Sequence, residues 1–162
     1  LAILPWPQAL RGEVELARND PTAADNLLRQ SFARACQLGD PCWEAMAARG
    51  LAMVAEATGE TTRAFELLAD ARTRCNRLAD PYVWLDGYIR DAQCSLGVRH
   101  GHPDTDVWVD TMQRLTSRTA MRELNVRSLL YGAALGHEGD GAAAVLLAAQ
   151  VENPSLHLLL SE

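Results

Sequence analysis

A helix-breaking turn recurs about every forty residues along this chain. The turn positions are Asn19, Gly59, Gly101 and Gly139, which stand 40, 42 and 38 residues apart. Around Asn19, Gly59 and Gly139, alanine and leucine recur on both sides at the three- and four-residue spacing of a helix. A period of this length is typical of stacked helical hairpins, in which each hairpin buries its apolar face against the next. The repeat therefore constrains the fold more than any other feature.

The chain is predicted to be all-α and to form one domain over residues 1–162. Alanine and leucine, which favour helix, are abundant, and no alternating run of β-branched residues indicates a strand. We expect about four antiparallel pairs stacked as an α-solenoid with one continuous core. The eight expected helices span residues 5–18, 22–38, 41–57, 61–78, 81–98, 104–116, 119–136 and 141–150.

The links between pairs repeat as well. The sequence Leu-Gly-Asp-Pro at 38–41 is answered forty residues later by Leu-Ala-Asp-Pro at 78–81. Proline is favoured in the first turn of a helix, and an aspartate before it can cap the free backbone N–H groups. Both links are therefore predicted to start helices.

Charge and hydropathy exclude several classes of protein. The formal net charge is -6, so the chain repels phosphate backbones and is not expected to bind nucleic acid directly. No apolar run reaches the roughly 18 residues of a membrane helix, and no signal peptide is visible. We expect a cytoplasmic protein that does not bind membranes. Because it begins with Leu1, we expect it to be a fragment of a larger protein.

Four cysteines are present, at positions 36, 42, 75 and 94. None forms a C-x-x-C pair, so neither a zinc ribbon nor a redox motif is indicated. We expect buried free thiols in a reducing cytoplasm.

The sequence His-Gly-His-Pro-Asp-Thr-Asp at 100–106 concentrates imidazoles and carboxylates. Gly101 is the expected turn of the third pair, and Asp104 and Asp106 fall where carboxylates favour the positive end of a helix dipole. A metal site would need both histidines and a further ligand, such as Cys94, against the usual spacing of zinc ligands. We interpret the cluster as a helix start. No catalytic motif such as G-x-S-x-G appears, and we predict no catalytic residue, no metal and no cofactor.

The segment from Leu51 to Ala71 resembles a tetratricopeptide repeat, with Gly59 at the turn and small or apolar residues at the matching positions. The resemblance implies a right-handed superhelix of helix pairs. The period is nearer 40 than the expected 34 residues, and the usual first-helix aromatic residues are replaced by Ala48 and Ala55.

The chain as a whole resembles the helical-repeat segment of large actinobacterial LuxR-like and SARP-like regulators, which are multidomain ATPases. The resemblance lies in ARACQLGDPCWEAMAARGLAMVAEATGE, PYVWLDGYIRDAQCSLGVRHGHPD and VENPSLHLLL. It implies a signalling module beside nucleotide-binding and DNA-binding parts. This sequence contains neither a G-x-x-x-x-G-K-[ST] loop nor a basic helix-turn-helix. The implied role is protein interaction or effector sensing.

In tetratricopeptide-like stacks the first helices of the pairs line a concave groove. Aromatic residues and arginine are enriched at binding hot spots. The candidate groove residues are Arg49, Met53, Trp84, Tyr88, Asp91 and Arg127. On the fifth expected helix, Leu85, Ile89, Ala92 and Leu96 form a separate apolar stripe that we assign to the core. The alternative for Trp84 and Tyr88 is that they only pack between neighbouring helices.

Three kinds of partner stay open. The first is a protein or peptide held in the groove, and the second is a small effector in the same place. The third is a purely structural scaffold that forms a homodimer through the leucine-rich tail, residues 156–160. Asn153-Pro154 is a stop signal, and the apolar tail after it is expected to cap the last pair or to dock on a neighbour.

Overall fold

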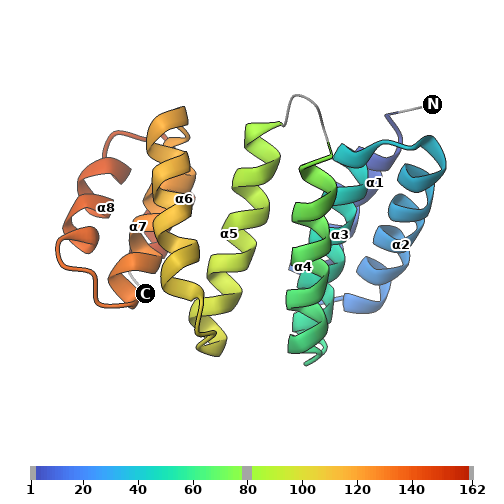
Figure 1. Cartoon of the computed structure of the whole chain (residues 1–162), viewed down its shortest axis with the longest axis horizontal. Helices are drawn as coiled ribbons and strands as arrows, with labels where there is room; N and C mark the ends of the chain where they lie inside the picture. The colour runs from blue at the N-terminus through green and yellow to red at the C-terminus, as the bar shows by residue number, and fades with distance from the viewer. Residues whose placement is uncertain (1–2, 78–81, 161–162) are drawn as a thin grey trace. The chain divides into compact units, whose positions relative to one another are not determined.

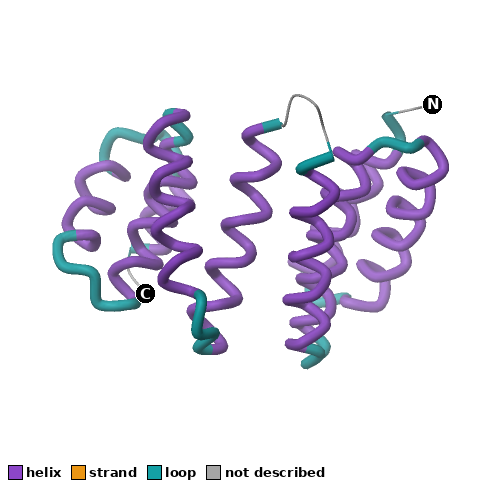
Figure 2. The backbone as a smooth tube through the Cα atoms, in the orientation of Figure 1, coloured by secondary structure: helices purple, strands orange, loops and turns teal. Residues whose placement is uncertain are grey.

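The computed structural model describes residues 3–77 and 82–160, and within these ranges the chain forms helices and no strand (Figures 1 and 2). Successive helices pack as neighbours from α1 to α4 and again from α6 to α8. The helices of the described residues are α1 (Pro5–Ala17), α2 (Pro21–Leu38), α3 (Pro41–Ala57), α4 (Thr61–Cys75), α5 (Val83–His100), α6 (Thr105–Thr119), α7 (Arg122–Ala134), α8 (Asp140–Ala148) and α9 (Pro154–Leu159). The all-α prediction is confirmed for this part of the chain, and the eight expected helices are found with ends shifted by at most three residues where both ends are described.

All four predicted turn positions adopt a left-handed backbone conformation. Asn19, Gly59 and Gly101 follow the end of a helix, whereas Gly139 is the residue before α8. The φ angles are +63° at Asn19, +83° at Gly59, +63° at Gly101 and +87° at Gly139. Glycine enters this region without strain, and asparagine tolerates it better than most residues. A residue with left-handed backbone geometry therefore recurs about every forty residues, at the positions where the sequence predicts a turn.

The first link between pairs behaves as predicted. Pro41 is the first residue of α3, and the side chain of Asp40 accepts hydrogen bonds from the backbone N–H groups of Cys42 and Trp43. The second link, at 78–81, and the helix ends predicted at 78 and 81 lie outside the described residues.

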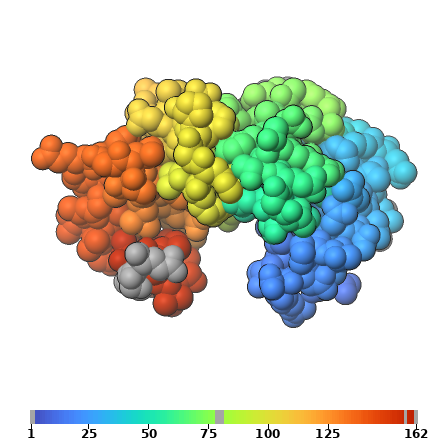
Figure 3. Space-filling model, turned by 90° about the horizontal axis from the view of Figure 1, so that it is seen from below, coloured from blue at the N-terminus to red at the C-terminus, as the bar shows by residue number. Residues whose placement is uncertain are grey.

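The chain divides into two compact units, Leu1–Ile89 and Arg90–Glu162, with the division inside α5. In unit 1, helices α1 to α4 pack against one another, as their blue-to-green atoms show in Figure 3. The core is built largely from alanine, and Leu28 is fully buried at its centre. Gly12 of α1 and Gly50 of α3 face this leucine so closely that an added Cβ would overlap it. Small residues thus allow α1, α2 and α3 to approach closely.

Unit 2 has two apolar clusters. Cys94, Val109, Met112 and Leu124 join the C-terminal half of α5 to α6 and α7. The second cluster joins α7, α8 and the tail, and it consists of Val126, Ala144, Ala148 and Leu156. The stripe assigned to the core on α5 is buried at all four positions, from Leu85 to Leu96, so that prediction is confirmed.

The tail differs from the prediction, because Asn153 and Pro154 do not stop a helix. The preceding helix, α8, already ends at Ala148, and residues 154–159 form the short helix α9. The side chain of Asn153 accepts a hydrogen bond from the backbone N–H of Ser155 at 3.0 Å, and Pro154 occupies the first helical position. The two residues that were read as a stop signal therefore start a helix. Leu156 is buried in the second cluster, which confirms that the tail covers the last pair.

None of the helices in the described ranges combines the length and the apolar character that crossing a bilayer requires.

Candidate functional site

The aromatic groove is an apolar hollow in unit 1, with a volume of about 440 Å³. It is lined by Trp6, Leu10, Glu13, Met46, Trp84 and Tyr88. These residues come from α1, α3 and α5, which are the first helices of the first three predicted pairs. The prediction that first helices share a groove therefore matches the lining of this hollow within unit 1.

Aromatic rings dominate the groove. Trp84 and Tyr88 lie one helical turn apart and contact edge to face, with ring centroids 6.3 Å apart. Trp6 stacks on Trp43 of α3 at 5.8 Å. Trp6 and Tyr88 keep 40% and 44% of their surface exposed. Large aromatic side chains left this open are the usual mark of a binding surface.

Arg49 of α3 lies beside the groove and interacts with two neighbouring helices. Its guanidinium pairs with Glu13 of α1 at 2.8 Å, donates to the backbone carbonyl of Tyr88 at 3.1 Å, and lies 5.5 Å from the centre of the Tyr88 ring. One side chain of α3 thus contacts both α1 and α5. Glu13 is the charged residue among those that line the groove, and it is paired with Arg49.

The predicted groove residues fall into two groups, one in each unit. In unit 1, Arg49 and Tyr88 are in contact, while Met53 is half-buried one turn beyond Arg49 on α3 and does not line the groove. In unit 2, the buried carboxylate of Asp91 accepts hydrogen bonds from Arg127 Nε at 2.7 Å and from the Tyr131 hydroxyl at 2.8 Å. Asp91 and Arg127 therefore satisfy each other as a charge pair between α5 and α7.

Sequence reasoning missed the half of the groove that α1 supplies. Ile3, Trp6, Leu10 and Val14 are all exposed. The four-residue spacing of Trp6, Leu10 and Val14 places them on one side of α1, away from the buried Ala9 and Gly12, and Ile3 lies in the turn before the helix. A helix with an apolar stripe on each side carries more apolar surface than its core requires, and this signal is present in the sequence.

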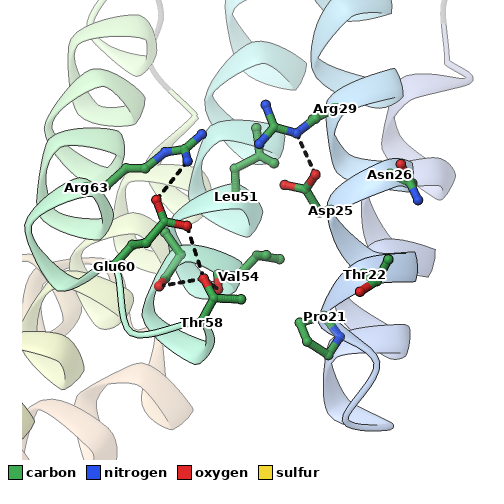
Figure 4. Close-up of a pocket in the computed structure, with 11 residues that line it drawn as sticks. Pro21, Thr22, Asp25, Asn26, Arg29, Leu51, Val54, Thr58, Glu60 and Arg63 are labelled. Carbon is green, nitrogen blue, oxygen red and sulfur yellow. Dashed lines mark hydrogen bonds and ion pairs between the residues drawn. The ribbon is translucent and has the colours of Figure 1, made fainter.

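A second hollow, the polar pocket, lies between α2, α3 and the start of α4, with a volume of about 270 Å³ (Figure 4). Its floor is apolar and its rim holds two arginines and two carboxylates. The lining residues are Pro21, Thr22, Asp25, Asn26, Arg29, Leu51, Val54, Ala55, Thr58, Glu60 and Arg63. No residue of this pocket was singled out as a binding candidate from the sequence.

The segment 100–106 forms the turn and helix start that were expected. Asp104 is the residue before α6, and its backbone N–H donates to His102 Nδ1 at 3.2 Å. The His102 ring stacks on Trp108 at 4.4 Å. Asp106, in the first turn of α6, contacts His137 Nε2 at 2.6 Å. Within the described residues, no group of three or more histidine, cysteine or acidic side chains is placed to hold a metal ion.

The prediction of buried cysteines is correct at three positions and wrong at Cys36 of α2, which is exposed. None of the four cysteines forms a disulfide. Burial raises the pKa of Cys42 from 9.0 to about 12, and the neighbouring Asp40 adds to this effect. A thiol held neutral in this way is a packing residue rather than a nucleophile.

Comparison with known proteins adds no assignment, since no family model, curated protein or solved structure matches the chain.

Proposed function

We propose that this chain is a non-catalytic binding module, a tetratricopeptide-like α-solenoid whose aromatic groove holds a protein or peptide partner. The observation that carries the proposal is the cluster of three aromatic residues in an apolar hollow, in which Trp6 and Tyr88 are exposed and Trp84 is half-buried. Tryptophan and tyrosine contribute most to binding when they line such a pocket, because they bury a large area at little cost in conformational entropy.

The arrangement of helices supports the repeat assignment. The groove is lined by the first helices of three successive pairs, and the turns within pairs share one backbone conformation. Both features are expected of a stack of helical hairpins, which presents its first helices to a ligand.

The partner best suited to the groove is an amphipathic helix. The exposed stripe of α1 runs from Trp6 to Val14, about 12 Å at 1.5 Å per residue. A partner helix with apolar residues at positions i, i+4 and i+7 covers a stripe of this length and places side chains in the hollow.

The resemblance to actinobacterial regulators supplies the setting. In a cytoplasmic transcriptional regulator, the module would act as a switch. A partner that binds the active and inactive states with different affinity would shift the balance between them in the attached ATPase and DNA-binding parts.

A small effector is the second candidate. The groove volume of about 440 Å³ lies within the roughly 300–1,000 Å³ of small-molecule pockets. Such a ligand would contact the same rings, so the two candidates differ in the size of the ligand and not in the site.

The test is a selection from a library of random 16-residue peptides displayed on phage. We expect enriched peptides with apolar residues at helical spacing. Substituting both Trp84→Ala and Tyr88→Ala should weaken their binding by about 30-fold or more, as expected for two hot-spot residues. The matched control is Val145→Ala with Leu146→Ala, which removes exposed apolar side chains from α8 in unit 2.

Circular dichroism separates loss of the site from loss of the fold. The double variant should keep the helical signal of the parent chain. Unchanged affinity in the groove variant, or a collapse of its helicity, would contradict the proposal.

A further inference from the structure

The polar pocket lies on the face of α3 opposite to the aromatic groove. Leu51, Val54 and Ala55 of the pocket are separated by roughly half a turn around the helix from Met46 and Arg49, at 100° per residue. In Figure 4, Asp25 and Arg29 project from α2 on one side, and Glu60 and Arg63 project from the start of α4 on the other. The pocket is therefore a second site, separate from the groove.

Opposite charges face each other across this pocket without touching. Arg29 pairs with Asp25 on its own helix, and Glu60 pairs with Arg63 on its own helix. Arg29 and Glu60 nevertheless influence each other electrostatically. The hydrogen bond to Asp25 raises the pKa of Arg29, and Glu60 adds to the rise. The bond from Arg63 lowers the pKa of Glu60, and Arg29 adds to the fall. Both groups stay charged at neutral pH.

The pocket also has hydrogen-bonding capacity that the chain does not use. Arg29 gives its Nε–H to Asp25, and among the described residues its two terminal nitrogens have no hydrogen-bond acceptor. The second oxygen of Asp25 and the hydroxyl of Thr22 likewise have no hydrogen-bond partner among the described residues. The floor between these groups is aliphatic, with Val54 and Ala55 buried beneath it. A few convergent polar groups over an apolar floor are the usual composition of a small-ligand site.

A ligand that bridges Arg29 and Glu60 must be negative at one end and positive at the other. Arginine binds a carboxylate with two parallel N–H bonds, and a carboxylate accepts from an ammonium group. A volume of about 270 Å³ holds on the order of nine water molecules, which is comparable to a small amino acid. We propose that the polar pocket binds a free α-amino acid with an aliphatic side chain, its carboxylate on Arg29, its ammonium on Glu60, and its side chain on Leu51 and Val54.

Isothermal titration calorimetry with L-leucine tests this proposal. Two capped relatives, N-acetyl-leucine and leucinamide, each keep the side chain but only one of the two charges. We expect L-leucine to bind at least about tenfold more tightly than either, because each loses a charge-assisted hydrogen-bonded contact. Arg29→Gln and Glu60→Gln should each weaken leucine binding by a similar factor.

The matched control is Arg114→Gln. Arg114 forms the same kind of i,i+4 pair with Asp110 on α6, at comparable exposure, and its loss should leave leucine affinity unchanged. The groove variant Trp84→Ala with Tyr88→Ala should also bind leucine normally, so this proposal and the proposed function fail separately. Absence of leucine binding, equal binding of leucinamide, or equal effects of R29Q and R114Q would overturn the assignment.

Discussion

Leu28 is the residue at which the packing of the first three helices converges. It is fully buried, and both Gly12 of α1 and Gly50 of α3 lie against its side chain. Glycine normally weakens a helix by about 1 kcal/mol relative to alanine. Here its absent side chain makes room for a leucine that three helices share.

We predict that Gly50→Ala destabilises the chain. The new Cβ would overlap Leu28 Cδ2, and this leucine has no room to retreat because Gly12 lies against its Cγ. Overpacking costs about 1–3 kcal/mol, which exceeds the gain of up to about 1 kcal/mol in helix propensity. Urea unfolding should show a net loss of about 1 kcal/mol or more.

Gly141→Ala is the control for that prediction. A Cβ at this position of α8 would lie 3.7 Å from Ala133, an ordinary contact. Only the propensity gain applies there, so the variant should be as stable as the parent chain or slightly more so. An equal loss in both variants would show that Leu28 is not tightly held.

The raised pKa of Cys42 predicts how the free energy of unfolding changes at alkaline pH. Its pKa is about 12 in the folded chain against an ordinary 9.0, so the unfolded chain loses the thiol proton first. This stabilisation is complete below pH 9 and declines as the pH rises towards 12, by up to about 1.4 kcal/mol per pH unit. When the pH is raised from 8 to 10.5, the free energy of unfolding in urea should therefore fall by about 2 kcal/mol less in Cys42→Ala than in the parent chain. Cys36→Ala, at an exposed thiol, should behave like the parent.

At the scale of helices, the turns were predictable and the surfaces were not. Asn19 and the three turn glycines could be placed because a left-handed residue is a local requirement that the sequence displays directly. The buried stripe of α5 followed from its spacing for the same reason. The groove depends on which exposed side chains of α1 and α5 lie near each other, and this is set by packing between helices.

The residues assigned to the groove from α5 and α7 illustrate that limit. Trp84, Tyr88 and Asp91 have the spacing of one stripe, yet Asp91 is buried and bonded to Arg127 and Tyr131. Helical spacing identified the face of Asp91 but not its partner, which is 36 residues away in sequence.

The contact between α5 and α7 should contribute strongly to stability. Asp91→Ala removes the carboxylate to which both Arg127 and Tyr131 donate. Breaking a buried pair costs about 3–5 kcal/mol, and because Arg127 is one third exposed we expect about 2–3 kcal/mol. Tyr131→Phe removes two hydrogen bonds, the one that the hydroxyl donates to Asp91 and the one that it accepts from Arg127, and should cost about 1–2 kcal/mol.

Asp110→Ala is the comparison for this pair. It breaks an exposed ion pair with Arg114 and should change the unfolding free energy by less than about 1 kcal/mol. If Asp91→Ala costs no more than Asp110→Ala in urea unfolding, the α5–α7 pair is not a stabilising contact.

For the whole molecule, the tail bears on the choice between a binding module and a self-associating scaffold. Leu156 is buried against α7 and α8, and Leu159 and Leu160 pack on the same cluster. Leu146 and Leu158 remain 68% and 69% exposed. Because most of the tail is covered within unit 2, we expect a monomer at micromolar concentration in size-exclusion chromatography with light scattering. A stable dimer dispersed by Leu146→Ala with Leu158→Ala would favour the scaffold.

The most direct test of the binding groove uses the four tryptophans of the chain as reporters. Trp6 and Trp84 line the groove, and Trp43 stacks on Trp6, whereas Trp108 contacts His102 in unit 2. Their indole N–H signals can be followed separately by ¹⁵N NMR during titration with a peptide selected from the library. The groove account predicts that the Trp6 and Trp84 signals move while the Trp108 signal stays in place. Movement of Trp108 with Trp6 and Trp84 unchanged would place the binding site elsewhere and contradict the account.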